Sequence, residues 1–197
     1  ARIADLVGDT DAVRPYEELA GRIRQAFKEQ YVEGNPGGVG NGSQTSLGCA
    51  LYFSLLDTVE AAEVAADLVE TIRESDLNLD FGVLGSKFVP HALARYGYPQ
   101  EAFDMIHTED YPGWGNWVSR GATTLWEDWP GEASLNHVFF GDVSAWFYEY
   151  LGGIRPDPDQ PGFKHIIIRP FIPKGLDEVR VVHESGYGKI MSQWKRE

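Results

Sequence analysis

The feature that most constrains the fold is a change of pattern near residue 155. Before that point, apolar residues recur three or four positions apart, the spacing of one face of an α-helix. The segment 155–162 (RPDPDQPG) then breaks the helical pattern with its prolines. Beyond it lie the β-branched run 166–168 and the alternating segment 178–181, both typical of strands. The sequence therefore predicts a mainly α protein that ends in a short antiparallel β segment.

The helical part divides into several expected helices. Within 58–72, Ala61, Ala65, Leu68 and Ile72 form the clearest apolar stripe. Pro90 predicts a late start or a kink in its helix. Ser43 and Thr45 are candidate caps after the Gly-rich loop 35–42. The remaining expected stripes are Leu19, Ile23 and Phe27; Leu47, Ala50, Leu51 and Leu55; Leu84, Phe88, Ala92 and Tyr96; a short helix over 100–106; and Phe139, Val143, Phe147 and Leu151 in a helix from about residue 137.

The composition excludes several classes of function. The chain carries 30 acidic against 17 basic residues, a net charge of −13, which argues against nucleic acid or an anionic membrane as a partner. The single cysteine, Cys49, excludes an intramolecular disulfide and a multi-cysteine metal site. The five histidines show no close ligand pair, so we expect no metal and no cofactor. No run approaches the ~18 apolar residues of a membrane span.

A glycine-rich, non-helical segment, 108–136, holds four of the six tryptophans: Trp114, Trp117, Trp126 and Trp129. Indole faces at the rim of a loop suit the apolar face of a sugar ring, and neighbouring carboxylates bind its hydroxyls. The alternative is a tryptophan-rich loop that packs over the end of a helix. Both interpretations remain open from the residues alone.

Glu127 is the candidate acid or base of this segment. It lies between Trp126 and Trp129, with Asp128 beside it. A carboxyl group between indoles loses hydration and is held in place, as a general acid or base requires. The alternative is an ion-paired or solvated loop carboxylate.

Three segments of this region together resemble the signature of a known family. They are YPGWG at 111–115, GATTLWEDW at 121–129 and SLNH at 134–137, and they are similar to the motif of bacterial α-L-rhamnosidases, glycoside hydrolase family 78. The resemblance covers most of residues 1–170, including FGVLGS at 81–86. It implies the C-terminal portion of an (α/α)6 barrel of the six-hairpin glycosidase type. That partial toroid would span 1–154, a linker 155–162, and the start of a β-sandwich 163–197.

The family resemblance also implies a reaction, the inverting removal of terminal α-L-rhamnose from glycans or glycosides. In this mechanism one carboxylic acid protonates the leaving oxygen while a carboxylate on the other face activates water. Glu127 matches the general base. We expect His137 at the start of a helix, whose positive end would keep the imidazole neutral. The expected substrate contacts are Trp114, Trp126, Trp129, Asn136 and His137.

Two positions depart from the family pattern. Asp128 stands where arginine is common in the family, and Pro130 stands where an acidic residue is frequent. Nothing before Tyr111 matches the acid-rich loop that holds the family's general acid. The resemblance therefore implies a bacterial fragment that carries the base without the acid and is inactive alone. We expect exposed helix faces to favour self-association.

The sequence leaves the compartment open among cytoplasm, periplasm and secretion. Two other classes of function compete with the hydrolase. One is a non-catalytic carbohydrate-binding module with the tryptophan-rich loop as its platform. The other is a helical-toroid interaction protein whose aromatic residues are all core. Replacement of Glu127 by glutamine separates them, since only the hydrolase would lose turnover.

Overall fold

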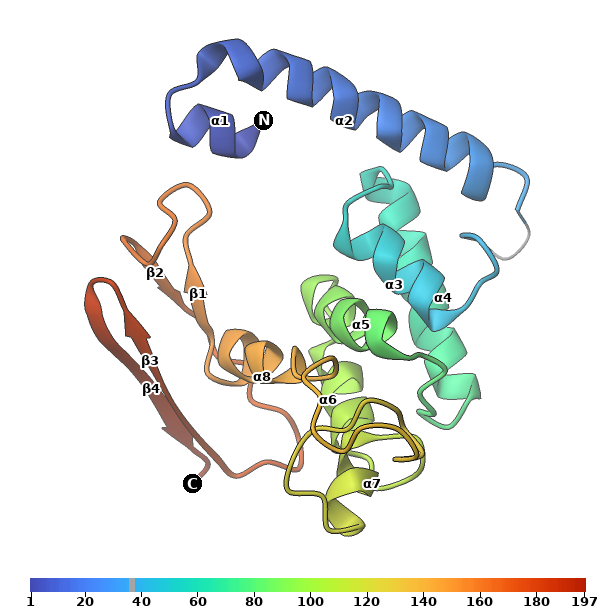
Figure 1. Ribbon diagram of the computed structural model, residues 1–197, viewed down its shortest axis with the longest axis vertical. Coiled ribbons are helices and arrows are strands. Elements are labelled where there is room, and N and C mark those ends of the chain that lie inside the picture. The colour runs from blue at the N-terminus through green and yellow to red at the C-terminus, as the bar shows by residue number, and fades with distance from the viewer. Residues whose placement is uncertain (36–37) are drawn as a thin grey trace.

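The computed structural model describes residues 1–35 and 38–197, and the chain forms an open ring of helices flanked by two β-hairpins (Figure 1). Pro36 and Gly37 of the expected loop lie outside the described residues. The helices are α1 (Arg2–Leu6), α2 (Thr10–Tyr31), α3 (Gln44–Tyr52), α4 (Thr58–Glu74), α5 (Val83–Arg95), α6 (Pro99–His107), α7 (Trp114–Ser119) and α8 (Val143–Trp146), which continues as the π-helical turn η1 (Phe147–Leu151). The strands are β1 (Ile154–Pro156), β2 (Ile166–Ile168), β3 (Glu178–Ser185) and β4 (Gly188–Lys195).

Side-chain caps define the starts of α3 and α4. Ser43 caps α3, since its hydroxyl accepts the Ser46 N–H at 3.3 Å. Asp57 caps α4 in a capping box, in which Asp57 accepts the Glu60 N–H while the Glu60 carboxylate accepts the Asp57 N–H. These reciprocal bonds satisfy amides that the first turn of a helix leaves without partners.

The core lies between α3, α4, α5 and α6. The stripe predicted for α4 is buried throughout: Ala61, Ala65, Leu68 and Ile72. Gly48 allows α3 to approach α5 closely, because a Cβ there would lie 2.7 Å from Cγ2 of Val89. The predicted fold class, mainly helical with a C-terminal antiparallel segment, is confirmed.

The predicted inward face of α5 is partly wrong. Leu84 is 63% exposed, and the fully buried positions include Val89 and Ala92. The expected residues were four apart, and that spacing drifts around a helix of 3.6 residues per turn. Pro90 lies inside α5, which starts at Val83, and its carbonyl accepts the Trp146 indole N–H at 3.0 Å.

The helix expected from about residue 137 begins only at Val143. Residues 137–138 are irregular and residues 139–142 form turns instead, and Phe139 is exposed. The reason is local hydrogen bonding, because the His137 N–H donates to the Leu125 carbonyl at 2.8 Å. That bond commits this backbone to pairing with the loop 125–127 before a helix can start.

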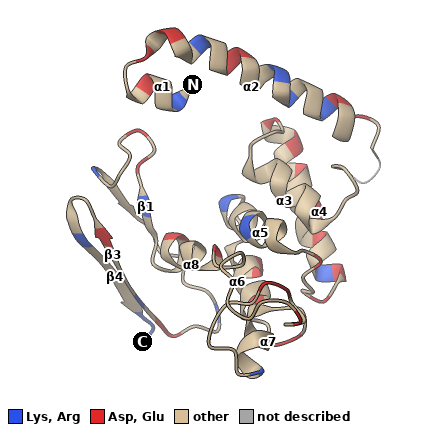
Figure 2. Cartoon of the chain, viewed as in Figure 1, with Lys and Arg blue, Asp and Glu red and all other residues tan. Residues whose placement is uncertain are grey.

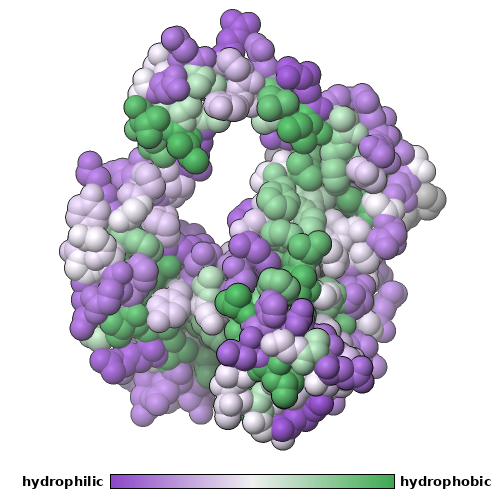
Figure 3. Space-filling view, in the orientation of Figure 1, coloured by the Kyte–Doolittle hydropathy of each residue, from purple (hydrophilic) through white to green (hydrophobic). Residues whose placement is uncertain are grey.

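The helix α2 carries the predicted apolar stripe, of which only Phe27 is half-buried against the core. None of its residues is buried, and Ile23 is 54% exposed. Acidic and basic residues are spread along the rest of the helix (Figure 2). In the space-filling view an open passage runs through the ring beneath α1 and α2 (Figure 3). The helices α1 and α2 together form an arch, and ion pairs hold it at both ends. These are Arg2–Asp159 at 3.0 Å and Lys28–Glu60 at 2.6 Å.

The two hairpins are antiparallel and attach to the end of η1. Ile154 pairs with Ile168 in the first hairpin, so residues 157–165 form its turn. In the second, β4 turns Ile190 and Ser192 inward as predicted, and half-buried Trp194 donates its indole N–H to the Leu151 carbonyl at 2.8 Å. Within the described parts of the chain, no helix has both the length and the apolar character needed to cross a bilayer.

Candidate active-site loop

The four clustered tryptophans form a small aromatic core beneath the loop. Trp114 and Trp117 belong to α7, while Trp126 and Trp129 follow it in the loop. At most 8% of each residue is exposed. The Trp129 ring lies 4.8 Å from Trp117 and 4.3 Å from Phe140 between centroids. The indoles therefore pack on one another, and their faces do not form an open platform.

Their indole N–H groups also tie separate segments together. Trp114 donates to the Phe140 carbonyl at 3.2 Å, and Trp117 donates to the Trp129 carbonyl at 3.0 Å. Trp129 donates to the Phe81 carbonyl at 2.6 Å, which joins the loop to the residues before α5. A buried indole that lacked such an acceptor would be costly, so this cluster holds the loop in one conformation.

Above this core, two arms of the loop pair with each other. The Glu127 N–H donates to the Ser134 carbonyl at 2.9 Å, and the His137 N–H donates to the Leu125 carbonyl at 2.8 Å. The Thr124 hydroxyl donates to the Leu135 carbonyl as well. This pairing brings the Glu127 and His137 side chains, ten residues apart in the sequence, to the same place.

Asp128 builds the turn between the two arms. Its Oδ1 accepts the backbone N–H groups of Gly131, Glu132 and Ala133 at 2.9, 3.0 and 3.4 Å. An aspartate that accepts successive amides is a common way to stabilise a turn. The departure from the family pattern at this position therefore has a structural role in this chain.

The Glu127 carboxylate and the His137 imidazole form the polar centre of the loop. Glu127 Oε2 accepts the Ser134 N–H at 3.2 Å and lies 3.5 Å from His137 Nδ1. The side chains are 39% and 29% exposed, so both reach solvent. Among the described residues, both contacts fall on Oε2. The carboxylate is therefore held through one oxygen, Oε2.

The prediction that His137 lies at the start of a helix is wrong, because α8 begins six residues later at Val143. Its neighbour is the Glu127 carboxylate, and the Phe139 ring lies 3.9 Å away between centroids. An explanation based on the positive end of a helix therefore does not apply to this imidazole. Asn136 is exposed beside it, and its N–H donates to the Ser134 hydroxyl at 3.3 Å.

The structure adds two residues that the sequence reasoning had missed. The Arg120 guanidinium lies 4.7 Å from the centre of the Trp126 ring and donates to the Pro130 carbonyl at 2.8 Å. Ser134 bonds Glu127 through both its carbonyl and its N–H. Ser134 lay within the recognised motif, but backbone bonding leaves no mark on residue type. Nothing in the sequence around Arg120 indicated that it would contact Trp126.

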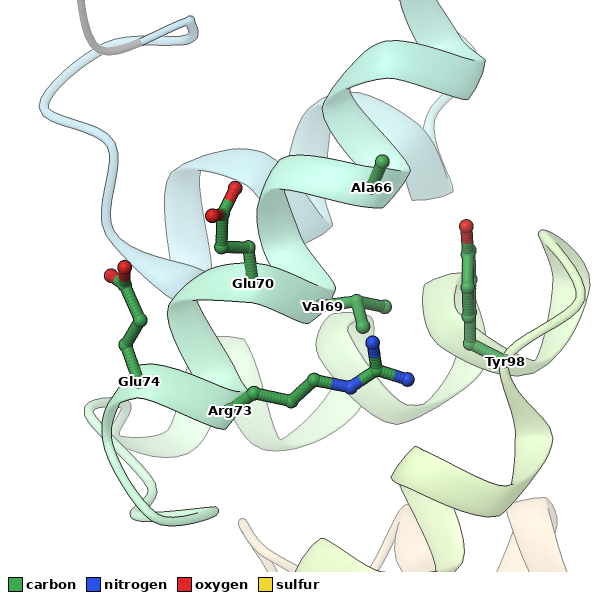
Figure 4. Close-up of a pocket in the computed structure, with 6 residues that line it drawn as sticks. All are labelled: Ala66, Val69, Glu70, Arg73, Glu74 and Tyr98. Carbon is green, nitrogen blue, oxygen red and sulfur yellow. The ribbon is translucent and has the colours of Figure 1, made fainter.

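One hollow of the structure is remote from this centre. It has a volume of about 540 Å3 and lies along α4 beside Tyr98 (Figure 4). Arg73, one of its lining residues, pairs with Glu101 at 2.5 Å. None of the predicted site residues lines it, so we place the candidate site on the geometry of the loop. In the described part of the chain, no cluster of three or more histidine, cysteine or acidic side chains could hold a metal ion.

Helical hairpins that carry an exposed, positioned carboxylate on an indole-packed loop are an arrangement suited to glycoside hydrolases. Two family models match the chain. Residues 1–151 match the bacterial alpha-L-rhamnosidase 6 hairpin glycosidase domain, and residues 153–197 match the bacterial alpha-L-rhamnosidase C-terminal domain. The chain belongs to the bacterial alpha-L-rhamnosidase family.

Similar proteins and solved structures are also alpha-L-rhamnosidases. An alpha-L-rhamnosidase of Streptomyces avermitilis is 30% identical over 100% of this chain, and one of Formosa agariphila is 29% identical over 99%. The crystal structure of Streptomyces avermitilis alpha-L-rhamnosidase complexed with L-rhamnose has a TM-score of 0.91 at 28% identity, covering 100% of this chain and 20% of that one. The native enzyme from Aspergillus terreus has a TM-score of 0.90 at 26% identity, covering 98% of this chain and 23% of that one. The chain spans only 20% and 22% of the length of the two curated relatives.

Proposed function

We propose that this chain supplies the general base of an inverting hydrolase that removes terminal α-L-rhamnose from glycans or glycosides. Glu127 Oε1 would accept a proton from the attacking water, while Oε2 stays bound to the Ser134 N–H. The observation that carries the proposal is the pairing of Glu127 with His137 on a loop fixed by buried indoles. A base must be held in position while it still reaches water, and this arrangement does both.

The other predicted substrate residues take different parts in this proposal. His137 and Asn136 lie at the surface of the loop, where they can meet sugar hydroxyls. Trp126, adjacent to Glu127, would present only an edge to the sugar, since 8% of it is exposed. Trp114 and Trp129 are buried to the same extent, and we propose that they support the floor of the site through their packing.

Inversion also requires a second carboxyl group. Single displacement by water needs an acid about 6.5–9.5 Å from the base, on the other face of the sugar. We propose that this acid belongs to the part of the rhamnosidases that this chain does not cover. The 197 residues alone would then retain the base and part of the sugar site without turnover.

The test is Glu127→Gln in a longer polypeptide. In this polypeptide, the present chain is joined to the region of a related rhamnosidase that the chain itself does not cover. We expect the rate of hydrolysis of an aryl α-L-rhamnoside to fall about 10²–10⁴-fold, because a general base contributes that much. L-Rhamnose binding should persist, since glutamine keeps the shape of the side chain. In the active protein, NMR should show β-L-rhamnose as the first product.

Glu132→Gln is the matched control, because Glu132 is an exposed carboxylate of the same loop. It should leave the rate unchanged. Full activity of Glu127→Gln would refute the assignment of the base. A first product with the α configuration would refute inversion and leave the family intact.

The carbohydrate-binding module remains the competing proposal, and the 197-residue chain tests it directly. A module would bind a glycan through stacked indoles, so Trp129→Phe should weaken binding while Glu127→Gln should not. The indole faces are buried, which argues against binding a glycan by stacking on them. Retained binding in Trp129→Phe of this chain, together with lost turnover in Glu127→Gln of the joined polypeptide, would favour the hydrolase.

A further inference from the structure

Three arginine side chains meet at a hollow between the helices and the first hairpin. Arg95 ends α5, Arg155 lies in β1, and Arg169 follows β2. All three line a cavity of about 440 Å3, and a second cavity of about the same volume shares Arg155 and Arg169. Basic residues on α5 and β1 lie on either side of α8 in Figure 2. Segments far apart in the sequence thus place positive charge in one hollow.

The charge of this hollow is opposite to that of the chain. The chain has a net charge of −13, yet here three guanidinium groups surround one carboxylate, Glu149. In the described residues, none of the three forms an ion pair with a carboxylate, whereas Arg73 elsewhere does. Glu149 itself lies 3.5 Å from Nδ1 of His91. One carboxylate offsets part of the charge of three guanidinium groups, so the lining of the hollow keeps an excess of positive charge.

Neutral groups hold two of these guanidinium groups in place. Arg95 donates to the Tyr52 carbonyl at 2.8 Å. Arg155 lies 5.3 Å from the centre of the Tyr150 ring and donates to the Arg169 carbonyl at 3.5 Å. Nε of Arg155 is buried, and no acceptor for it exists among the described residues. A buried N–H without an acceptor is costly and is relieved when an acceptor binds.

The walls of the hollow are built rigidly. The π-helical turn η1, closed by the Gly152 N–H to the Phe147 carbonyl at 2.8 Å, carries Glu149 and Tyr150 along one wall. The opposite wall is fixed by the Arg169 N–H, which donates to the Gly153 carbonyl at 2.9 Å. π-Helical turns occur often at functional sites, and rigid walls reduce the entropy lost when a ligand binds.

The ionisation of Glu149 reports the same positive environment. Burial opposes the ionised form of this carboxyl. The hydrogen bond and charge of His91 and the charges of Arg155 and Arg95 outweigh burial, so the pKa of Glu149 lies below its ordinary range. An incoming anion would meet the same arginine charges.

We propose that this hollow binds an oxyanion, either phosphate or the carboxylate of a sugar acid, through Arg155, Arg169 and Arg95. The planar guanidinium group offers paired donors that match the oxygens of a phosphate or a carboxylate. The Arg155 Nε–H would gain its acceptor there. The site shares no lining residue with the Glu127 loop, so it stands whether or not the chain supplies the base for hydrolysis.

Calorimetric titration of the 197-residue chain tests the site with inorganic phosphate and with D-glucuronate. D-Glucose is the neutral control for the sugar ring. We expect Arg155→Gln to weaken anion binding about tenfold or more, because it removes charge-assisted hydrogen bonds. Arg95→Gln, at an exposed position, is the second variant should Arg155→Gln fail to fold. Arg180→Gln, on exposed β3, removes the same charge elsewhere and should leave the affinity unchanged.

The two anions distinguish the sources of the oxyanion. Tighter binding of glucuronate than of phosphate, with none of glucose, would assign a sugar acid, and the reverse order would assign phosphate. Equal losses in Arg155→Gln and Arg180→Gln would overturn the site, because they would show only general attraction. Failure of both anions to bind below about 10 mM would overturn it as well.

Discussion

The turn that returns the chain from Glu127 to Ser134 depends on Gly131, and its replacement by alanine is a sharp test of the loop. Gly131 has a φ of +75°, a conformation that L-residues rarely adopt. A Cβ there would lie 2.5 Å from Cε3 and from Cζ3 of Trp126. The indole has little room to retreat, because it is buried, 5.6 Å from the Trp117 ring, with Arg120 over its face.

Gly121→Ala is the matched control in the same loop. Gly121 has a φ of +83°, and no atom lies within 4 Å of the Cβ that alanine would add. Both variants incur backbone strain of about 1–2 kcal/mol. Only Gly131→Ala adds overpacking, which costs about 1–3 kcal/mol. The free energies of unfolding of the two variants should therefore differ by about 1–3 kcal/mol.

Urea unfolding, followed by tryptophan fluorescence and by circular dichroism, measures this difference. With a slope of about 2 kcal/mol per molar urea, the midpoint of Gly131→Ala should lie about 0.5–1.5 M below that of Gly121→Ala. Equal midpoints at equal slopes would refute the reasoning, since they would show that the indole moves aside without cost. That result would also remove the basis for a fixed Glu127.

Three further predictions concern the turn, the pH dependence and the association of the chain. Asp128→Ala should lower the free energy of unfolding by about 1–2 kcal/mol, and Asp128→Asn by less, because asparagine keeps an acceptor for the amides; equal losses in urea unfolding would contradict this. The pKa of Glu149 is lowered in the folded chain, so its stabilisation is complete above the unfolded pKa of about 4.3 and is lost as the pH falls through the folded pKa. Glu149→Gln should therefore flatten the acid side of a stability–pH curve, and parallel curves would count against it. We expect the chain to self-associate through the stripe of α2, where Leu19 is 42% and Ile23 54% exposed. Sedimentation velocity should show larger species that Leu19→Glu with Ile23→Glu reduces, whereas a monomer at high concentration would contradict the expectation.

The helical framework was predictable because its signal is periodic. The α4 stripe ending at Ile72 and the inward face of β4 followed from spacing, since burial selects residue types along a regular backbone. The start of α8 was not predictable in this way. A single loop hydrogen bond, from the His137 N–H to Leu125, delays that helix, and backbone bonds across a loop have no residue signature.

The candidate site was predictable in its members more than in their arrangement. The motif identified Glu127 and His137, which the loop brings together. The roles of the indoles depend on burial, which is a property of the whole fold, so the sequence left platform and packing as equal alternatives. The role of Asp128 depends on three amides that follow it, and only the turn geometry shows them.

The arch formed by α2 has a consequence for how the chain opens. This helix has no fully buried residue and is held by its caps, by half-buried Phe27 near its C-terminal end and by a few ion pairs, and helices with so little packing are marginal in water. Its amide hydrogens should exchange with solvent well before those of α4, as a separate unit of low local stability. A protein surface that packed on the apolar stripe of α2 would bury apolar area, and it would also slow the exchange of the amides of this helix. Protection from exchange along Thr10–Tyr31 would then report whether that face is covered.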